Sequence, residues 1–120
     1  MRPKSAMARE GANINMPLER SAGDGAFLRA LEIAVGAIDR FSASALVLAM
    51  GLDASEENPF GGLKVTADGF SRIGEMVGNM GLPTVLVQEC GYVYPSLGAN
   101  LIRLLQGFEK TQTALGVGAI

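Results

Sequence analysis

The sequence has 120 residues and a formal net charge of −2, with 10 basic and 12 acidic side chains spread along it. Apolar residues make up 48% of the chain, which is enough to form the core of one domain. No Lys/Arg cluster is present, which argues against a nucleic-acid partner. The longest apolar run, residues 45–52, is too short to span a bilayer.

Histidine is absent from the sequence, and cysteine occurs once, at Cys90. One copy of the chain therefore lacks a histidine general base, a Ser-His-Asp triad and any histidine-ligated metal site. A single cysteine forms no internal disulfide, and no hydrophobic signal segment follows the basic residues at the start. These features favour a cytoplasmic protein without a membrane partner.

Residues 1–10 carry no periodic pattern and are interpreted as a loose N-terminal segment. Residues 13–18 alternate apolar and polar side chains and then meet Pro17, which predicts a short strand. The next element is a helix, with Asp24 expected as its N-cap. Its apolar side chains recur at intervals of three or four and share one face: Phe27, Leu31, Val35 and Ile38.

Two further strand–helix pairs follow along the chain. Continuous apolar residues at 45–50 predict a strand covered on both faces, as in a parallel sheet, and residues 84–87 predict another strand. Between them, Thr66 is expected to cap a helix that ends near Gly81. A last helix is expected to open at Ser96.

The order is therefore strand–helix repeated three times, which predicts an α/β fold with a parallel sheet. Three strands are few for a sheet with helices on both faces, so the chain is interpreted as part of a three-layer α/β/α domain. The domain is expected at residues 11–110, with residues 111–120 as a tail. A partial sheet exposes an apolar strand edge, so we expect a marginal monomer that self-associates.

Polar side chains follow two of the predicted strands, at the edge where parallel sheets bind ligands. Asp53 follows residues 45–50 and Tyr92 follows residues 84–87, each close to a glycine that lets the backbone turn or approach a ligand. The residues alone leave alternatives open. Asp53 is either a ligand-binding carboxylate or a turn or capping residue, and Tyr92 serves either catalysis or packing.

Three stretches carry a family resemblance. Residues 11–18 read Gly-Ala-Asn-Ile-Asn-Met-Pro-Leu, residues 46–53 end in Gly-Leu-Asp before an Asn-Pro-Phe-Gly-Gly turn, and residues 81–92 end in Glu-Cys-Gly-Tyr. Matches continue at 97–100 and 105–108. In this order and spacing, the stretches resemble the C-terminal part of the zinc-dependent histone deacetylase and acetylpolyamine amidohydrolase family, which has an arginase-deacetylase-like α/β fold. The details are closer to the bacterial acetylpolyamine amidohydrolase-like branch.

The resemblance implies hydrolysis of an acetylated amine, of the acetylpolyamine or acetyl-lysine type. In the family, two aspartates and one histidine hold a zinc ion that polarises the acetyl carbonyl and activates water. A tyrosine donates a hydrogen bond to the oxyanion that forms. By position, Asp53 matches the second aspartate ligand, Tyr92 matches the tyrosine, and Gly91 matches the substrate-side glycine before it.

The resemblance also implies an incomplete site. The family's His-His pair and its Asp-x-His segment are both missing from this sequence. Catalytic zinc usually has about three protein ligands, so the chain alone is expected to be inactive and to pair with a missing N-terminal half. The main alternative is a non-catalytic binding or structural module derived from the same fold. A flavodoxin-like or nucleotide-binding domain is disfavoured, because no Gly-x-Gly-x-x-Gly or Walker motif is present.

Two residues depart from the family pattern. Asn58 stands where an aspartate commonly precedes proline, and Cys90 stands where a glycine is usual. A positive φ at Cys90 would cost on the order of 1 kcal/mol or more. Its side chain is otherwise expected to be small and buried.

Overall fold

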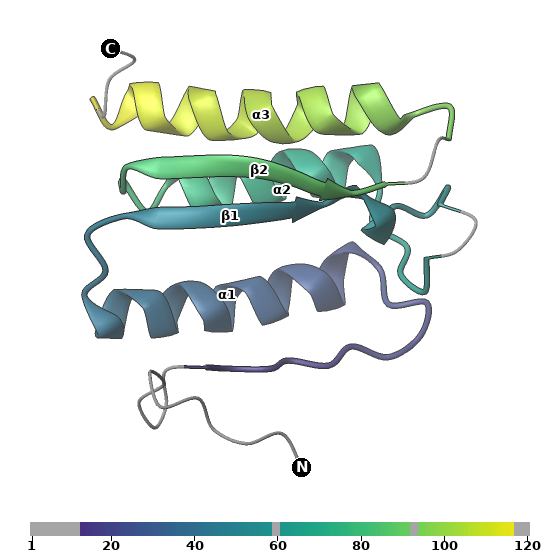
Figure 1. The fold of residues 1–120 in the computed structure, drawn as a ribbon, viewed down its shortest axis with the longest axis horizontal. Coiled ribbons are helices and arrows are strands. Elements are labelled where there is room, and N and C mark those ends of the chain that lie inside the picture. The colour runs from purple at the N-terminus through teal and green to yellow at the C-terminus, as the bar shows by residue number, and fades with distance from the viewer. Residues whose placement is uncertain (1–12, 59–60, 92–93, 117–120) are drawn as a thin grey trace.

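The computed structural model describes residues 13–58, 61–91 and 94–116. The elements in chain order are α1 (Asp24–Phe41), β1 (Leu46–Gly51), the 3₁₀ turn η1 (Leu52–Ala54), α2 (Ala67–Gly78), β2 (Thr84–Cys90) and α3 (Leu97–Ala114) (Figure 1). The last helix opens after Ser96, as predicted. It continues to Ala114 and so extends into the segment 111–120 that the sequence left as a tail.

The two strands pair in parallel, with Leu46 opposite Thr84 and Leu48 opposite Leu86. Between them the chain crosses over through α2, which is the connection that parallel strands require. The predicted α/β class with a parallel sheet is therefore confirmed. Of the three strands expected, the described residues form two.

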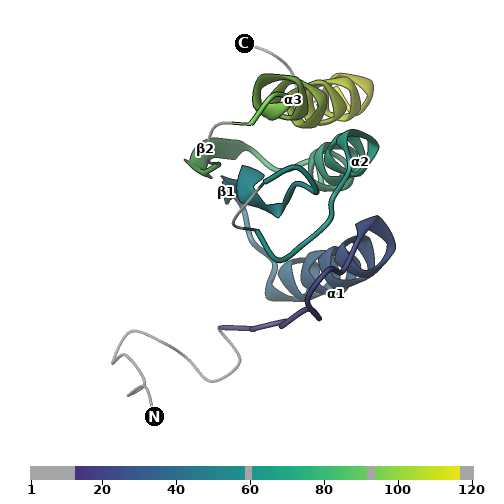
Figure 2. The same ribbon diagram turned by 90° about the vertical axis from the view of Figure 1, so that its right-hand side faces the viewer.

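The strand predicted at residues 13–18 is wrong. This segment runs along α1 on the side away from the sheet, and no described strand lies beside it (Figures 1 and 2). Main-chain pairing with a distant segment begins only later, where the Ser21 N–H donates to the Gly62 carbonyl and the Lys64 N–H donates to the Ala22 carbonyl at 2.8 Å. Alternating side chains do not make a strand unless a neighbouring strand satisfies its N–H and C=O groups.

The two-sided cover predicted for residues 45–50 is also wrong for the described chain. Side chains such as Leu48 and Leu86 face the core beneath the helices. Val47 and Val85, on the opposite face, are 69% and 59% exposed. Figure 2 shows the reason, because all three helices lie on one side of the strands.

The core is concentrated between the strands and the pair α2–α3. Phe70, Ile73 and Val77 from α2 and Leu104 from α3 are all buried in it. Glycines bring the two helices together main chain to main chain. A β-carbon added to Gly74 would collide with the carbonyl oxygen of Leu104, and one on Gly107 would collide with that of Ser71.

Of the two predicted helix N-caps, one is confirmed and one is wrong. Thr66 caps α2 as predicted, because its hydroxyl accepts a hydrogen bond from the Gly69 N–H at 3.1 Å. Asp24 is not the N-cap of α1; it is the first helical residue, and Gly23 is the cap. The Asp24 carboxylate instead accepts from the Thr66 N–H at 2.8 Å and from its hydroxyl at 2.5 Å. It therefore ties the start of α1 to the start of α2.

Candidate functional site at the strand ends

The carboxyl ends of β1 and β2 lie side by side. Gly51 pairs with Cys90, after an irregularity in the register between Met50 and Gly51. The turn η1 follows β1 directly and contains Asp53, whereas Gly91 follows β2 directly. The two sequence-predicted positions that the structure describes, Asp53 and Gly91, therefore come from adjacent segments at one edge of the sheet.

Asp53 is half-buried, and its carboxylate folds back toward the end of β1. A β-carbon built on Gly51 would lie 3.0 Å from the Asp53 Oδ1 atom, so glycine leaves room for this carboxylate. Within the described ranges, no hydrogen-bond donor reaches the carboxylate, and Asp53 lies inside the 3₁₀ turn η1. The role of the Asp53 carboxylate in metal binding stays a prediction.

Gly91 has a φ of +146°, a conformation that side-chain-bearing residues rarely adopt. A β-carbon at this position would also lie 2.8 Å from Leu97 Cδ1 and 3.1 Å from Leu52 Cβ. Glycine therefore lets the chain after β2 pack directly against Leu52, the residue before Asp53 in the turn η1. The substrate-side role of Gly91 is not tested by this geometry, and Tyr92 lies outside the described residues.

A second tyrosine, which the sequence did not single out, organises this edge. Tyr94 is buried, and its hydroxyl donates to the Leu52 carbonyl at 2.9 Å. The Asn100 Nδ2 atom donates to the same hydroxyl at 3.2 Å and to the Ser55 Oγ at 3.3 Å. Sequence periodicity gave no signal for this network, because its members are 42 and 45 residues apart and belong to different elements.

Asn58 holds the other side of the turn. Its Nδ2 atom donates to the Asp53 carbonyl at 3.2 Å, and the side chain is only 6% exposed. A charged aspartate, which the family resemblance implies for this position, would offer no such donor. The departure at Asn58 therefore replaces an acceptor with a donor to Asp53's own main chain.

Cys90 has neither the strained backbone nor the buried side chain that the sequence suggested. It lies in β2 and is absent from the residues with positive φ, so the expected strain does not arise. Cys90 is exposed rather than buried.

The described residues do not fit a complete zinc site. No group of three or more His, Cys, Asp or Glu side chains in residues 13–58, 61–91 and 94–116 is arranged to hold a metal ion. Asp53 offers one carboxylate, whereas catalytic zinc takes about three protein ligands. Reaction steps through a metal therefore cannot be assigned to these residues alone.

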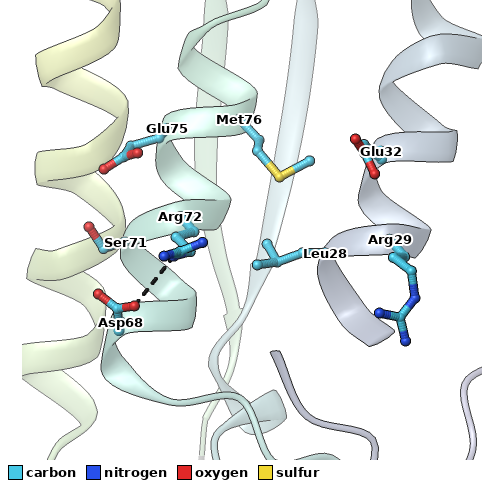
Figure 3. Close-up of a pocket in the computed structure, with 8 residues that line it drawn as sticks. All are labelled: Leu28, Arg29, Glu32, Asp68, Ser71, Arg72, Glu75 and Met76. Carbon is cyan, nitrogen blue, oxygen red and sulfur yellow. Dashed lines mark ion pairs between the residues drawn. The ribbon is translucent and has the colours of Figure 1, made fainter. Parts of the chain in front are cut away.

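A separate hollow of about 640 Å³ lies between α1 and α2. Figure 3 shows the mixed charge of its lining residues, which include Arg29 and Glu32 from α1 and Arg72 and Glu75 from α2. Arg72 pairs with Asp68 at 3.4 Å, and both side chains are more than half exposed. Exposed pairs of this kind contribute little to binding or stability, and the hollow includes none of the strand-end residues.

In the part of the chain that the structure describes, no helix combines the length and apolar character needed to cross a membrane.

Comparison with known proteins matches most of the chain to one family. The family model for the histone deacetylase domain matches residues 2–108. An acetylpolyamine amidohydrolase of Burkholderia pseudomallei (strain 1710b) is 40% identical over 98 residues, which are 82% of this chain and 29% of the relative. Acetylpolyamine amidohydrolase 2 of Pseudomonas aeruginosa (strain PAO1) is 34% identical over 99 residues, again 82% of this chain and 29% of the relative.

The fold agrees with a solved structure of the same group. The crystal structure of acetylpolyamine aminohydrolase from Burkholderia pseudomallei superposes with a TM-score of 0.81 at 39% identity. The match covers 84% of this chain and 30% of that one. The chain therefore spans less than a third of the length of these relatives.

Proposed function

Because this chain belongs to the histone deacetylase domain family, we propose that it supplies one section of a zinc-dependent deacetylase site. In this section, Asp53 is a metal-binding carboxylate, Tyr92 is the catalytic hydrogen-bond donor, and Gly91 borders the substrate. The observation that carries the proposal is the meeting of the two strand ends. Gly51 pairs with Cys90, which brings the Asp53 turn beside the segment that leads into Tyr92.

The substrate is an acetylated amine, and we favour a small acetylated polyamine over an acetyl-lysine side chain. This preference rests on the relatives named acetylpolyamine amidohydrolase, which share 34–40% identity with the chain. Zinc, when bound in the complete site, supplies a Lewis acid for the acetyl carbonyl. The chain's own contribution is to orient one carboxylate and one phenol at the same sheet edge.

The 120-residue chain alone is inactive under this proposal. It contains no histidine and no Asp-x-His segment, so the proton-transfer pair and two of the three zinc ligands that the family uses must come from elsewhere. The remainder of a deacetylase domain, on the same polypeptide or on another, is the expected partner. Its contact surface includes the uncovered sheet face with Val47 and Val85. A cytoplasmic location fits the exposed thiol of Cys90, which persists in a reducing compartment.

A hybrid protein tests the proposal. All 120 residues replace the matching segment of the Burkholderia pseudomallei relative, and acetate release from an acetylated diamine and bound zinc are measured. We expect an active hybrid. Asp53→Asn should remove zinc and activity, and Tyr92→Phe should keep zinc but lower kcat by about 10²–10³. Asp39→Asn, an exposed carboxylate on α1, is the matched control and should change neither quantity.

Two results would contradict the proposal. Acetate release by the 120-residue chain alone would show that its residues suffice. A hybrid that folds and retains zinc after Asp53→Asn would remove Asp53 from the metal site. A folded hybrid without any activity would favour the alternative, a non-catalytic binding or structural module, for which the absence of histidine is the supporting observation.

A further inference from the structure

The peptide groups on both sides of Asp53 are held by side chains from other segments. The Leu52 carbonyl, which belongs to the peptide group before Asp53, accepts a hydrogen bond from the Tyr94 hydroxyl at 2.9 Å. The Asp53 carbonyl, which belongs to the peptide group after it, accepts one from Asn58 Nδ2 at 3.2 Å. Because a peptide group is planar, fixing both carbonyls restricts the two backbone torsions of Asp53. The direction of its side chain is restricted with them.

The Tyr94 hydroxyl is itself oriented by a partner. Asn100 Nδ2 donates to it at 3.2 Å, so the hydroxyl oxygen accepts on that side and its proton is directed to Leu52. Tyr94 and Asn100 are 6% and 2% exposed, so water does not compete for these bonds. The Leu52 carbonyl also accepts from the Ser55 N–H at 3.3 Å, which closes the turn.

Tyr94 also links the two segments that contain the expected site residues. It lies two positions after Tyr92 in the chain, and it binds the residue immediately before Asp53. Building on the proposed function, we propose that Tyr94 is a positioning residue. Together with Asn58, it fixes the Asp53 carboxylate relative to the segment that follows β2. Neither side chain touches the substrate under this proposal; both act through the backbone of Asp53.

Hydrogen exchange in the full 120-residue chain tests the positioning directly. Tyr94→Phe removes only the hydroxyl, and Asn58→Ala removes the second donor. Each variant should speed exchange of the Ser55 amide, which closes the turn, by about threefold to tenfold, the range expected for one lost hydrogen bond. Thr84→Val is the matched control, because the Thr84 hydroxyl also donates to a main-chain carbonyl, that of Leu82 at 2.8 Å, at the opposite end of β2.

The control should leave Ser55 exchange unchanged. Unchanged exchange in both Tyr94→Phe and Asn58→Ala would overturn the inference, as would an equal acceleration in Thr84→Val. The latter would indicate a loss of overall stability instead of a local effect on the turn.

Zinc affinity in the hybrid protein, measured by competition with a chelator, provides the functional readout. Loss of a residue that orients a metal ligand typically weakens binding by about 10–100-fold, so Tyr94→Phe should weaken zinc binding at least about tenfold. Zinc binding as tight as in the unmodified hybrid would overturn the positioning role. If the unmodified hybrid binds no zinc, the proposed function fails, and the exchange measurement in the 120-residue chain still decides whether Tyr94 fixes the turn.

Discussion

At the scale of single residues, Gly91 combines two requirements that only glycine meets. Its φ of +146° is unfavourable for any residue with a β-carbon, and such a carbon would crowd Leu52 and Leu97. The segment after β2 therefore reaches the Asp53 turn only because this position has no side chain. A residue with a β-carbon at this position would therefore lose stability both through backbone strain and through steric crowding.

Gly91→Ala should lower the free energy of unfolding by about 1–3 kcal/mol, the range for one strained backbone position. Urea denaturation of the full chain is the measurement. Gly62→Ala is the matched control, because a β-carbon there meets nothing within 4 Å. An equal loss of stability in both variants would show that neither φ nor crowding at Gly91 matters.

The sequence indicated part of the residue-scale picture. Glycine beside a strand end predicted a sharp turn of the backbone or its close approach to a ligand. The structure shows a φ of +146° at Gly91, and approach to a ligand stays a prediction. Tyr94 was not predicted, because its importance depends on a hydrogen bond to Leu52, 42 residues earlier. A single tyrosine in a loop carries no local pattern that reveals such a partner.

At the scale of elements, the contact between α2 and α3 depends on the absence of side chains. Gly74 and Gly107 face main-chain atoms of the opposite helix, namely the carbonyl oxygens of Leu104 and Ser71. Main-chain atoms cannot rotate away as a flexible side chain can, so an added methyl group forces the helices apart.

Gly107→Ala is expected to destabilise the protein by about 1–3 kcal/mol, as overpacking in a core typically does. This loss should appear although alanine has the higher helix propensity. Thermal unfolding followed by circular dichroism measures it. Gly98→Ala lies in the same helix with open space around it, so it should leave stability unchanged or raise it slightly. A stable Gly107→Ala variant would mean that the helices are free to separate.

Elements were predicted best where the signal was local. The apolar spacing placed all three helices, and Thr66 was identified as a cap because its partner is three residues away. Asp24 also looked like a cap, but its carboxylate binds Thr66 in a distant segment. Residues 13–18 failed for the same reason, because a strand depends on a neighbour that the local pattern does not contain.

At the scale of the whole molecule, the uncovered sheet face is the main apolar surface of the strands. Val47, Val85 and Val87 are 69%, 59% and 40% exposed on it. Exposed apolar patches next to open strand edges promote association. The isolated chain should therefore form dimers or larger species in a concentration-dependent manner.

A Val47→Lys, Val85→Lys double variant should weaken self-association by at least about tenfold, because each buried valine contributes roughly 1.5–3 kcal/mol. Sedimentation velocity over a range of concentrations gives the association constant. Ile102→Lys changes an apolar side chain of α3 that is 54% exposed and serves as the control. Equal weakening by the control would place the contact elsewhere on the surface.

The uneven burial of the helices also has a consequence for the order of folding. Six residues of α2 are buried, whereas no residue of α1 is buried. The unit α2–β2–α3 closes over short sequence separations, which lowers the entropy cost of its formation. This unit is therefore the part of the chain suited to form first. We expect α1 to dock onto it afterwards through the Asp24–Thr66 contact, so native-state hydrogen exchange should be faster at the amides of α1 than at those of α2.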